Sequence, residues 1–267
     1  MSADKAPAVA RAFAILEAIR GHGPLTLTEI VERTGLNKST TYYLLQALSA
    51  RHIVELDEIG RRYRLGVGLI ELGAAASDGL TDVGVAKRYL AELLERLEVT
   101  IVLYQRLTPT EIILVDKLER VSRVRITLPL GTRIPIQGGS FGRAFLAFDE
   151  PDAVDRALVD GLQAFTAKSV VDPGTFRDEL AEVQRRGWAV DHEGFALGVS
   201  SVAAPIFGPG GRVSLVAAAV TFASALTDDL AAEYGEQLRS VCQRVSRTIA
   251  DVGGSGGLRS PDEGVPA

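Results

Sequence analysis

The stretch Thr26–Leu48, TLTEIVERTGLNKSTTYYLLQAL, constrains the fold of this chain more than any other. Apolar residues recur at helical spacing on both sides of a glycine-containing segment, which predicts two short helices with one apolar face each. Gly35 is suited to the left-handed conformation that ends a helix, and Asn37 is a strong N-cap for the next one. The stretch therefore predicts two helices joined by a tight turn.

Two helices in this arrangement are typical of a helix-turn-helix, whose second helix lies in the major groove of DNA. An ordinary helical hairpin has the same pattern, so this stretch alone leaves both interpretations open. The next residues favour the first one. Segments 53–56 and 61–65 predict two short strands around a turn that contains Gly60. A β-hairpin directly after a helix-turn-helix is the wing of a winged-helix domain.

The predicted DNA contacts come from the second helix and the wing. Leu44, Leu45 and Leu48 share the inward face, so the polar residues of the opposite face are free to meet base edges. The wing arginines are expected to contact phosphates, although solvated charges on an edge strand are the alternative. The residues predicted to bind DNA are Lys38, Ser39, Thr40, Tyr42, Tyr43, Gln46, Arg61, Arg62 and Arg64.

The charge distribution permits this interpretation. The net charge of the 267-residue chain is −5, yet residues 1–76 hold nine basic and eight acidic side chains, against 20 and 26 in the remainder. A local basic cluster can bind phosphates while a separate acidic domain sets the total charge. The charge therefore allows DNA binding without demonstrating it.

Targeting and membrane signals are missing from the sequence. No apolar run approaches the roughly 20 residues that cross a bilayer. The N-terminal residues lack the basic-then-apolar layout of a secretory signal, and the single cysteine, Cys242, allows no intrachain disulfide. We therefore expect a cytoplasmic protein without a membrane partner.

The order of predicted elements indicates an α+β fold in two parts. A helix over 7–20 has an apolar stripe made of Val9, Ala12, Phe13, Leu16 and Ile19. Further helices are predicted over 67–76, 81–97, 142–148, 151–159, 175–186 and 228–252, and strands over 100–104, 112–118, 121–128, 199–207 and 213–221, with a loop over 129–136. We expect a winged helix over 7–66, a linker helix over 67–79, a second domain with a largely antiparallel sheet over 80–252 and a disordered tail over 253–267.

Gly138–Gly142 fits G-x-S-x-G, the nucleophile-elbow motif of serine hydrolases. Asp191 and His192 lie downstream, so a small-molecule hydrolase that uses Ser140 is the alternative function. Two observations oppose it: the acid and the base are adjacent in the chain, and no parallel βαβ series precedes the motif. We therefore expect no enzyme, no catalytic residue and no cofactor. His192 and Glu193 have no second histidine close enough for a metal site.

Several blocks of the chain resemble the IclR family of bacterial transcription regulators, in the family's order. They are LTEIVERTGLNKSTTYYLLQAL (27–48), GRRYRLGVGLIEL (60–72), ILVDKLE (113–119), residues 138–147 and DHEGFALGVSSVAAPIF (191–207). The resemblance implies a winged-helix domain followed by a GAF-like effector domain, in a homodimer or a homotetramer. Two positions depart from the family pattern: Tyr43 stands where arginine is frequent, and His52 where glycine is frequent.

The resemblance also implies an effector site. Backbone amides of the glycine-rich loop would contact a small molecule at the start of a helix, where a carboxylate is favoured. The positions that match family effector contacts are Ser140, Phe141, Asp191, Val199 and Ser201.

The effector site departs from the family as well. Ser201 replaces a frequent cysteine, Ala218 and Val220 replace frequent serines, and Gln137-Gly138 replaces a His-Ala-type pair. Fewer polar groups beside a phenylalanine indicate an apolar or aromatic small acid. We therefore expect a ligand-responsive regulator that binds operator DNA, controls a catabolic operon and senses such an acid. Repression and activation both stay open.

Overall fold

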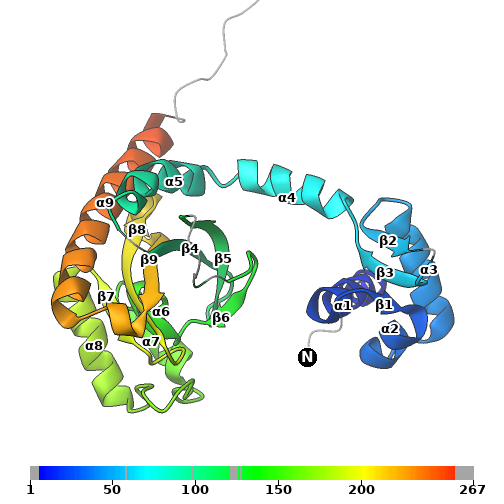
Figure 1. Cartoon of the computed structure of the whole chain (residues 1–267), viewed down its shortest axis with the longest axis horizontal. Coiled ribbons are helices and arrows are strands. Elements are labelled where there is room, and N and C mark those ends of the chain that lie inside the picture. The colour runs from blue at the N-terminus through cyan, green and yellow to red at the C-terminus, as the bar shows by residue number, and fades with distance from the viewer. Residues whose placement is uncertain (1–5, 58, 98, 121–125, 127, 256–267) are drawn as a thin grey trace, which may run out of the picture. The chain divides into compact units, whose positions relative to one another are not determined.

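The computed structural model describes residues 6–57, 59–97, 99–120, 126 and 128–255 (Figure 1). The chain divides into two compact units, Met1–Leu80 and Thr81–Ala267. Each unit has its own hydrophobic core, and each is described by itself.

The first unit is a winged helix. Its three-stranded antiparallel sheet has the order β1-β3-β2, and β1 is a two-residue strand that the sequence did not predict. The core consists of Ile15, Ile19, Leu25, Ile30, Leu45, Val54 and Tyr63. The elements are α1 (Pro7–His22), β1 (Leu25–Thr26), α2 (Leu27–Thr34), α3 (Lys38–Ser49), β2 (Val54–Asp57), β3 (Arg62–Leu65) and α4 (Gly68–Asp78).

Local sequence signals set the ends of α2 and α3. Thr26 and Glu29 form a capping box, in which Glu29 N donates to Thr26 Oγ1 at 3.3 Å and Thr26 N donates to Glu29 Oε2 at 2.7 Å. Gly35 ends α2 with φ 67°, and Asn37 Oδ1 accepts from Thr40 N at 2.8 Å. The predicted helix end and N-cap are confirmed.

The apolar stripe predicted for α1 was partly wrong. Ile15 and Ile19 are buried, but Val9 and Phe13 are 55% and 61% exposed. The helix contacts α2, α3 and β3 and buries the face of Ile15 and Ile19, whereas Val9 and Phe13 lie on a face that these elements leave exposed. The described residues of the unit therefore leave two apolar side chains of α1 without cover.

His52 follows α3 with φ 56°, in the left-handed region. Glycine adopts this conformation without steric cost, whereas a side chain with a Cβ is disfavoured there. The family glycine implied for this position therefore has a backbone reason, and His52 occupies a conformation that glycine would favour.

The second unit has a six-stranded antiparallel sheet of order β6-β5-β4-β9-β8-β7. Together with the winged helix it confirms the predicted α+β class and the effector-domain architecture. Its elements are α5 (Thr81–Leu94), β4 (Thr100–Arg106), β5 (Glu111–Leu118), β6 (Arg133–Pro135), α6 (Gly139–Leu146), α7 (Pro151–Leu158), α8 (Pro173–Arg186), β7 (Ala189–His192), β8 (Val199–Phe207), β9 (Val213–Phe222) and α9 (Asp228–Ser255).

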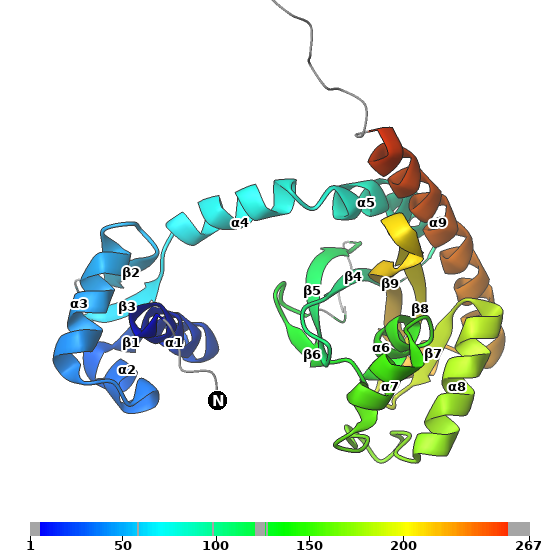
Figure 2. The same ribbon diagram turned by 180° about the vertical axis from the view of Figure 1, so that it is seen from behind.

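The two faces of this sheet have different neighbours. Figure 2 shows α5 and α9 along one side of the sheet, and α6 lies against β7, β8 and β9 from the other. Side chains alternate between the faces along each strand. Val102, Tyr104, Ala203 and Ala218 belong to the core cluster that contains α6. The sheet thus has one face covered by α5 and α9, and another that meets α6 and carries the candidate site.

Several predicted boundaries shift in this unit. Helix α6 begins at Gly139, three residues before the prediction, and strand β6 lies inside the segment predicted as a loop. The strand expected over 121–128 falls largely outside the described residues. Helix α9 continues to Ser255, three residues beyond its predicted end at 252, and the rest of the predicted tail, 256–267, lies outside the described residues. Among the described helices, none is long and apolar enough to cross a membrane.

Candidate functional site

Helix α3 presents the predicted DNA contacts on one surface. Ser39, Tyr42, Tyr43 and Gln46 are exposed on the face opposite the buried Thr41 and Leu45 of the same helix. Lys38 is exposed at the first position of the helix, and Thr40 is half-buried in the same turn. The N-cap residue Asn37 fixes the first turn of α3, because its Oδ1 accepts from Thr40 N and also from Ser39 Oγ, the latter at 2.9 Å.

The two tyrosine rings of α3 lie beside each other. Their centroids are 6.0 Å apart in an edge-on arrangement, and Tyr43 is 72% exposed. Two adjacent phenol groups offer donors and acceptors as well as apolar ring surface to a DNA groove.

The wing arginines are not equivalent. Arg62 Nη1 lies 3.0 Å from Glu29 Oε2 and donates to Pro24 O, also at 3.0 Å. Arg64 donates from Nε and Nη2 to Glu55 Oε2 at 3.1 and 2.9 Å. Arg61 follows the turn with φ 48°. Two of the three predicted phosphate contacts are thus engaged within the unit.

The carboxylates that hold these arginines also bind backbone amides. The amide of Thr26 is the main reason that the pKa of Glu29 is lowered, with Arg62 adding to it. The amide of Val67, which donates to Glu55 Oε1 at 3.2 Å, lowers the pKa of Glu55, again with an arginine adding to it. Glu29 links the wing to α2, and Glu55 links it to the residue before α4.

The second unit brings the five predicted effector residues together. Ser140 and Phe141 lie in the first turn of α6, whose residues are all buried. Ser140 Oγ and Ser201 Oγ are 2.7 Å apart, which joins α6 to β8. Asp191 is 5% exposed and lies across from Ser201 in the β7–β8 ladder. Val199 is half-buried on the same face of β8, two residues before Ser201.

Asp191 makes structural contacts that the sequence did not show. Its Oδ1 lies 3.2 Å from Arg143 Nη1, and its Oδ2 accepts from Phe195 N at 3.1 Å. Arg143 Nε also donates to Glu179 Oε2, at 2.6 Å. Arg143 was not predicted, because a charged side chain on a short helix is usually solvated. The arginine of this site is shared between two carboxylates.

Aromatic rings continue the site away from the serine pair. Phe141 lies 4.7 Å from Tyr104 and 5.2 Å from Phe195, centroid to centroid, and Phe165 lies 5.0 Å from Phe195. Three of these rings were missed. Phe195 lies within a block that carried the family resemblance, but nothing in the sequence placed Tyr104 or Phe165 beside it. We call Tyr104, Phe141, Phe195 and Phe165 the ring cluster.

Side-chain hydrogen bonds hold the loops around the ring cluster. Gln137 Nε2 donates to Ala157 O at 2.5 Å and Gly161 O at 2.9 Å, and its Oε1 accepts from Gln163 N at 2.9 Å. Ser169 Oγ donates to Gly194 O at 2.7 Å. The glutamine that departs from the family pattern therefore secures the segment that leads to Phe165.

The geometry opposes the hydrolase alternative. Strand alternation turns Asp191 and His192 to opposite faces, and His192 Nε2 lies 3.3 Å from Asp228 Oδ1. Ser140, the serine of the motif, is hydrogen-bonded to Ser201 rather than to a histidine. The final glycine has a packing reason: a Cβ on Gly142 would lie 1.9 Å from Ile136 O. The motif reflects a tightly packed helix start.

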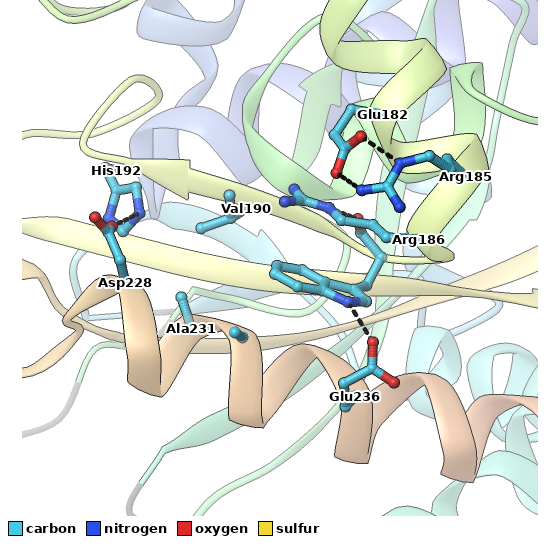
Figure 3. A pocket seen from close by; sticks show the side chains of 10 residues that line it. Glu182, Arg185, Arg186, Val190, His192, Asp228, Ala231 and Glu236 are labelled. Carbon is cyan, nitrogen blue, oxygen red and sulfur yellow. Dashed lines mark hydrogen bonds and ion pairs between the residues drawn. The ribbon is translucent and has the colours of Figure 1, made fainter.

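A separate surface pocket lies on the side of β7 that carries His192, between α8 and α9 (Figure 3). The guanidinium of Arg186 stacks 3.8 Å from the ring of Trp188, whose Nε1 donates to Glu236 Oε1 at 3.1 Å. Trp188 is buried, as expected, and so is Cys242, where burial raises the thiol pKa. None of the five predicted effector residues lines this pocket.

Comparison with known proteins covers both units. The IclR helix-turn-helix domain matches residues 8–58, and the bacterial transcriptional regulator IclR C-terminal domain matches residues 78–247. The transcriptional repressor AllR of Escherichia coli (strain K12) is 29% identical over 246 residues, which are 91% of this chain and 90% of AllR.

Solved structures agree with this assignment. An IclR transcriptional regulator from Alicyclobacillus acidocaldarius has a TM-score of 0.84 and 34% identity, covering 91% of this chain and 99% of that one. An IclR homologue from Microbacterium hydrocarbonoxydans, complexed with 4-hydroxybenzoate, shares the fold with a TM-score of 0.79 and 23% identity, covering 90% and 99%. The chain belongs to the IclR family of bacterial transcriptional regulators, and it is a regulator rather than an enzyme.

Proposed function

We propose that this regulator is a repressor that binds a palindromic operator as a dimer and responds to a small aromatic acid. The description of AllR as a repressor supports the first part. The exposed surface of α3 supports major-groove binding by Lys38, Ser39, Tyr42, Tyr43 and Gln46, together with the half-buried Thr40 of the first turn. Arg61 of the wing is the arginine best placed to meet a phosphate, because Arg62 and Arg64 already pair with carboxylates.

The ring cluster beside the Ser140–Ser201 pair carries the proposal for the effector. Aromatic side chains bind a flat ring through offset or edge-on contacts, and the hydroxyl groups and amides at the start of α6 suit the polar end of such a molecule. The complex of the M. hydrocarbonoxydans homologue with 4-hydroxybenzoate is consistent with this class. Regulation of a catabolic operon follows, since a repressor released by an aromatic acid would control enzymes that consume it.

The site proposed here differs from the residue set that the family resemblance implied. Ser140, Phe141 and Ser201 remain proposed contacts, and Val199 remains one at the rim. Asp191 acts through Arg143 and Phe195, because both of its carboxylate oxygens are already engaged.

A footprint with the full chain tests the function. DNA upstream of the gene itself and of its neighbouring operon is exposed to the protein, with 4-hydroxybenzoate, benzoate or glyoxylate added. We expect a protected palindrome whose protection weakens with the aromatic acids. An effector lowers DNA affinity only if it binds more tightly to the conformation that does not bind DNA than to the one that does. Release by glyoxylate alone would contradict the aromatic class, and no protected site would contradict the operator.

A further inference from the structure

The hydroxyl of Tyr104 is buried without a hydrogen-bond partner among the described residues. The whole residue is fully buried in β4, and its ring packs on Phe141. A buried hydroxyl that has left water and found no partner destabilises the fold, whereas phenylalanine would fill the same space without that penalty. The fold therefore gains nothing from this oxygen.

Tyr104 lies beside the proposed effector contacts. Phe141, against which its ring packs, follows Ser140 directly, and Ser140 is bonded to Ser201. On the neighbouring strand, Ala218 shares the face of Tyr104 where the family frequently has serine. On this face, Ala218 of β9 therefore lacks the hydroxyl group that a serine would supply, and Tyr104 of β4 carries one. Burial raises the pKa of Tyr104, so the phenol stays protonated and can donate.

We propose that Tyr104 is a specificity-determining residue of the effector site, whose Oη donates a hydrogen bond to an oxygen of a ring-bearing effector. This inference rests on the proposed effector function. The ring of the effector lies among the ring cluster, where Phe141 and Phe195 provide the aromatic contacts. The ligand class is a flat ring with a carboxylate, carbonyl or hydroxyl oxygen. Short aliphatic acids supply the oxygen without the ring and bind more weakly.

The test compares two identical changes in the full chain, Tyr104→Phe and Tyr89→Phe. Tyr89 Oη lies 2.9 Å from Thr248 Oγ1 between α5 and α9, on the other side of the sheet. Calorimetry with 4-hydroxybenzoate and benzoate measures affinity, and thermal unfolding measures stability. We expect Tyr104→Phe to weaken binding about five- to tenfold, which corresponds to one hydrogen bond, and to leave the Tm equal or higher. Tyr89→Phe should lower the Tm and leave binding unchanged.

The two probes identify the oxygen that Tyr104 contacts. A loss confined to 4-hydroxybenzoate assigns the ring hydroxyl, and an equal loss for both assigns the carboxylate; either result supports the proposal. Unchanged affinity for both, or a Tm that falls as far as in Tyr89→Phe, would overturn it while the aromatic effector stands. If neither acid binds the unmodified protein, the ring-bearing effector is wrong, and the separate footprint decides whether the proposed palindromic operator is correct.

Discussion

Arg143 Nη1 and Asp191 Oδ1 lie 3.2 Å apart, in side chains that are 8% and 5% exposed. They come from a helix and an edge strand 48 residues apart, and Asp191 also holds the amide of Phe195. Asp191, which the family resemblance implied as an effector contact, thus accepts hydrogen bonds that position Arg143 and the loop containing Phe195.

Replacing Asp191 should first affect stability. Asp191→Ala leaves Arg143 buried with the half-exposed Glu179 as its carboxylate partner, and the loss of one member of a buried pair costs about 3–5 kcal/mol. Urea unfolding measures the change. The double variant Arg143→Met with Asp191→Leu should recover most of the loss, because no unpaired charge remains at the pair. A stable Asp191→Ala protein that fails to bind an acid would instead make Asp191 a direct effector contact.

The wing arginines should differ in their effect on operator binding. Arg61→Ala removes one phosphate contact, so the slope of log affinity against log salt should become shallower by about 0.9. Arg64→Ala should change the slope less, because Glu55 holds that guanidinium. Shift assays across salt concentrations measure both. Arg177→Ala, which removes an exposed charge from the other unit, is the control. Equal effects of the Arg61 and Arg64 variants would show that the Arg64–Glu55 ion pair breaks on DNA binding and that Arg64 then contacts a phosphate.

Lys38→Ala is expected to act like Arg61→Ala, since Lys38 lies in the first turn of α3. Unchanged affinity at every salt concentration would contradict the assigned docking face.

The amides of α2 should lose protection from hydrogen exchange in acid, because Glu29 becomes protonated there and its carboxylate no longer supports the start of the helix. The pKa of Glu29 is lower in the folded chain than its usual value of 4.5, so its contribution is complete above 4.5 and is lost as the pH falls below that value. Hydrogen exchange of the α2 amides measures it. Glu29→Gln should reduce protection above pH 4.5 and match the unmodified chain in stronger acid, whereas Glu32→Gln, also on α2, should change little. Thr26→Ala should cost about 1 kcal/mol, because the helix cap is removed.

Two helical glycines should respond to alanine in opposite directions. A Cβ on Gly142 would collide with Ile136 O, so Gly142→Ala should lower the free energy of unfolding by at least about 1–3 kcal/mol. A Cβ on Gly84 of α5 would meet no atom of the described residues within 4 Å, so Gly84→Ala should raise it by about 0.5–1 kcal/mol. Thermal unfolding compares the two. A neutral Gly142→Ala would mean that α6 can move away from Ile136.

Self-association should depend on apolar residues that the first unit leaves exposed. Phe13 of α1 and Ile70 of α4 are 61% and 71% exposed, and exposed apolar side chains favour burial against a second copy. We expect Phe13→Asp with Ile70→Asp to weaken the dimer in sedimentation experiments. Val159→Asp, at a 77% exposed site of the second unit, is the control. An unchanged oligomer would place the interface elsewhere.

The sequence predicted the winged helix because its signals are local. Gly35 and Asn37 act on residues within four positions, so their roles as helix end and N-cap could be predicted before the fold was known. The predicted wing strands and the inward face of α3 depend on periodicity alone. The family resemblance added the effector residues Ser140 and Ser201, which the structure brings together.

The tertiary structure alone decided which charged side chains pair with each other across the fold. Glu29 and Glu55 take two of the three wing arginines, and Arg143 takes Asp191 from a strand 48 residues away. Pairings of this kind depend on which surfaces meet after the chain folds, and a single sequence does not record them. The same holds for Tyr104. Periodicity places it in a strand, but only the packing of α6 shows that its hydroxyl is buried without a partner among the residues that the structure describes.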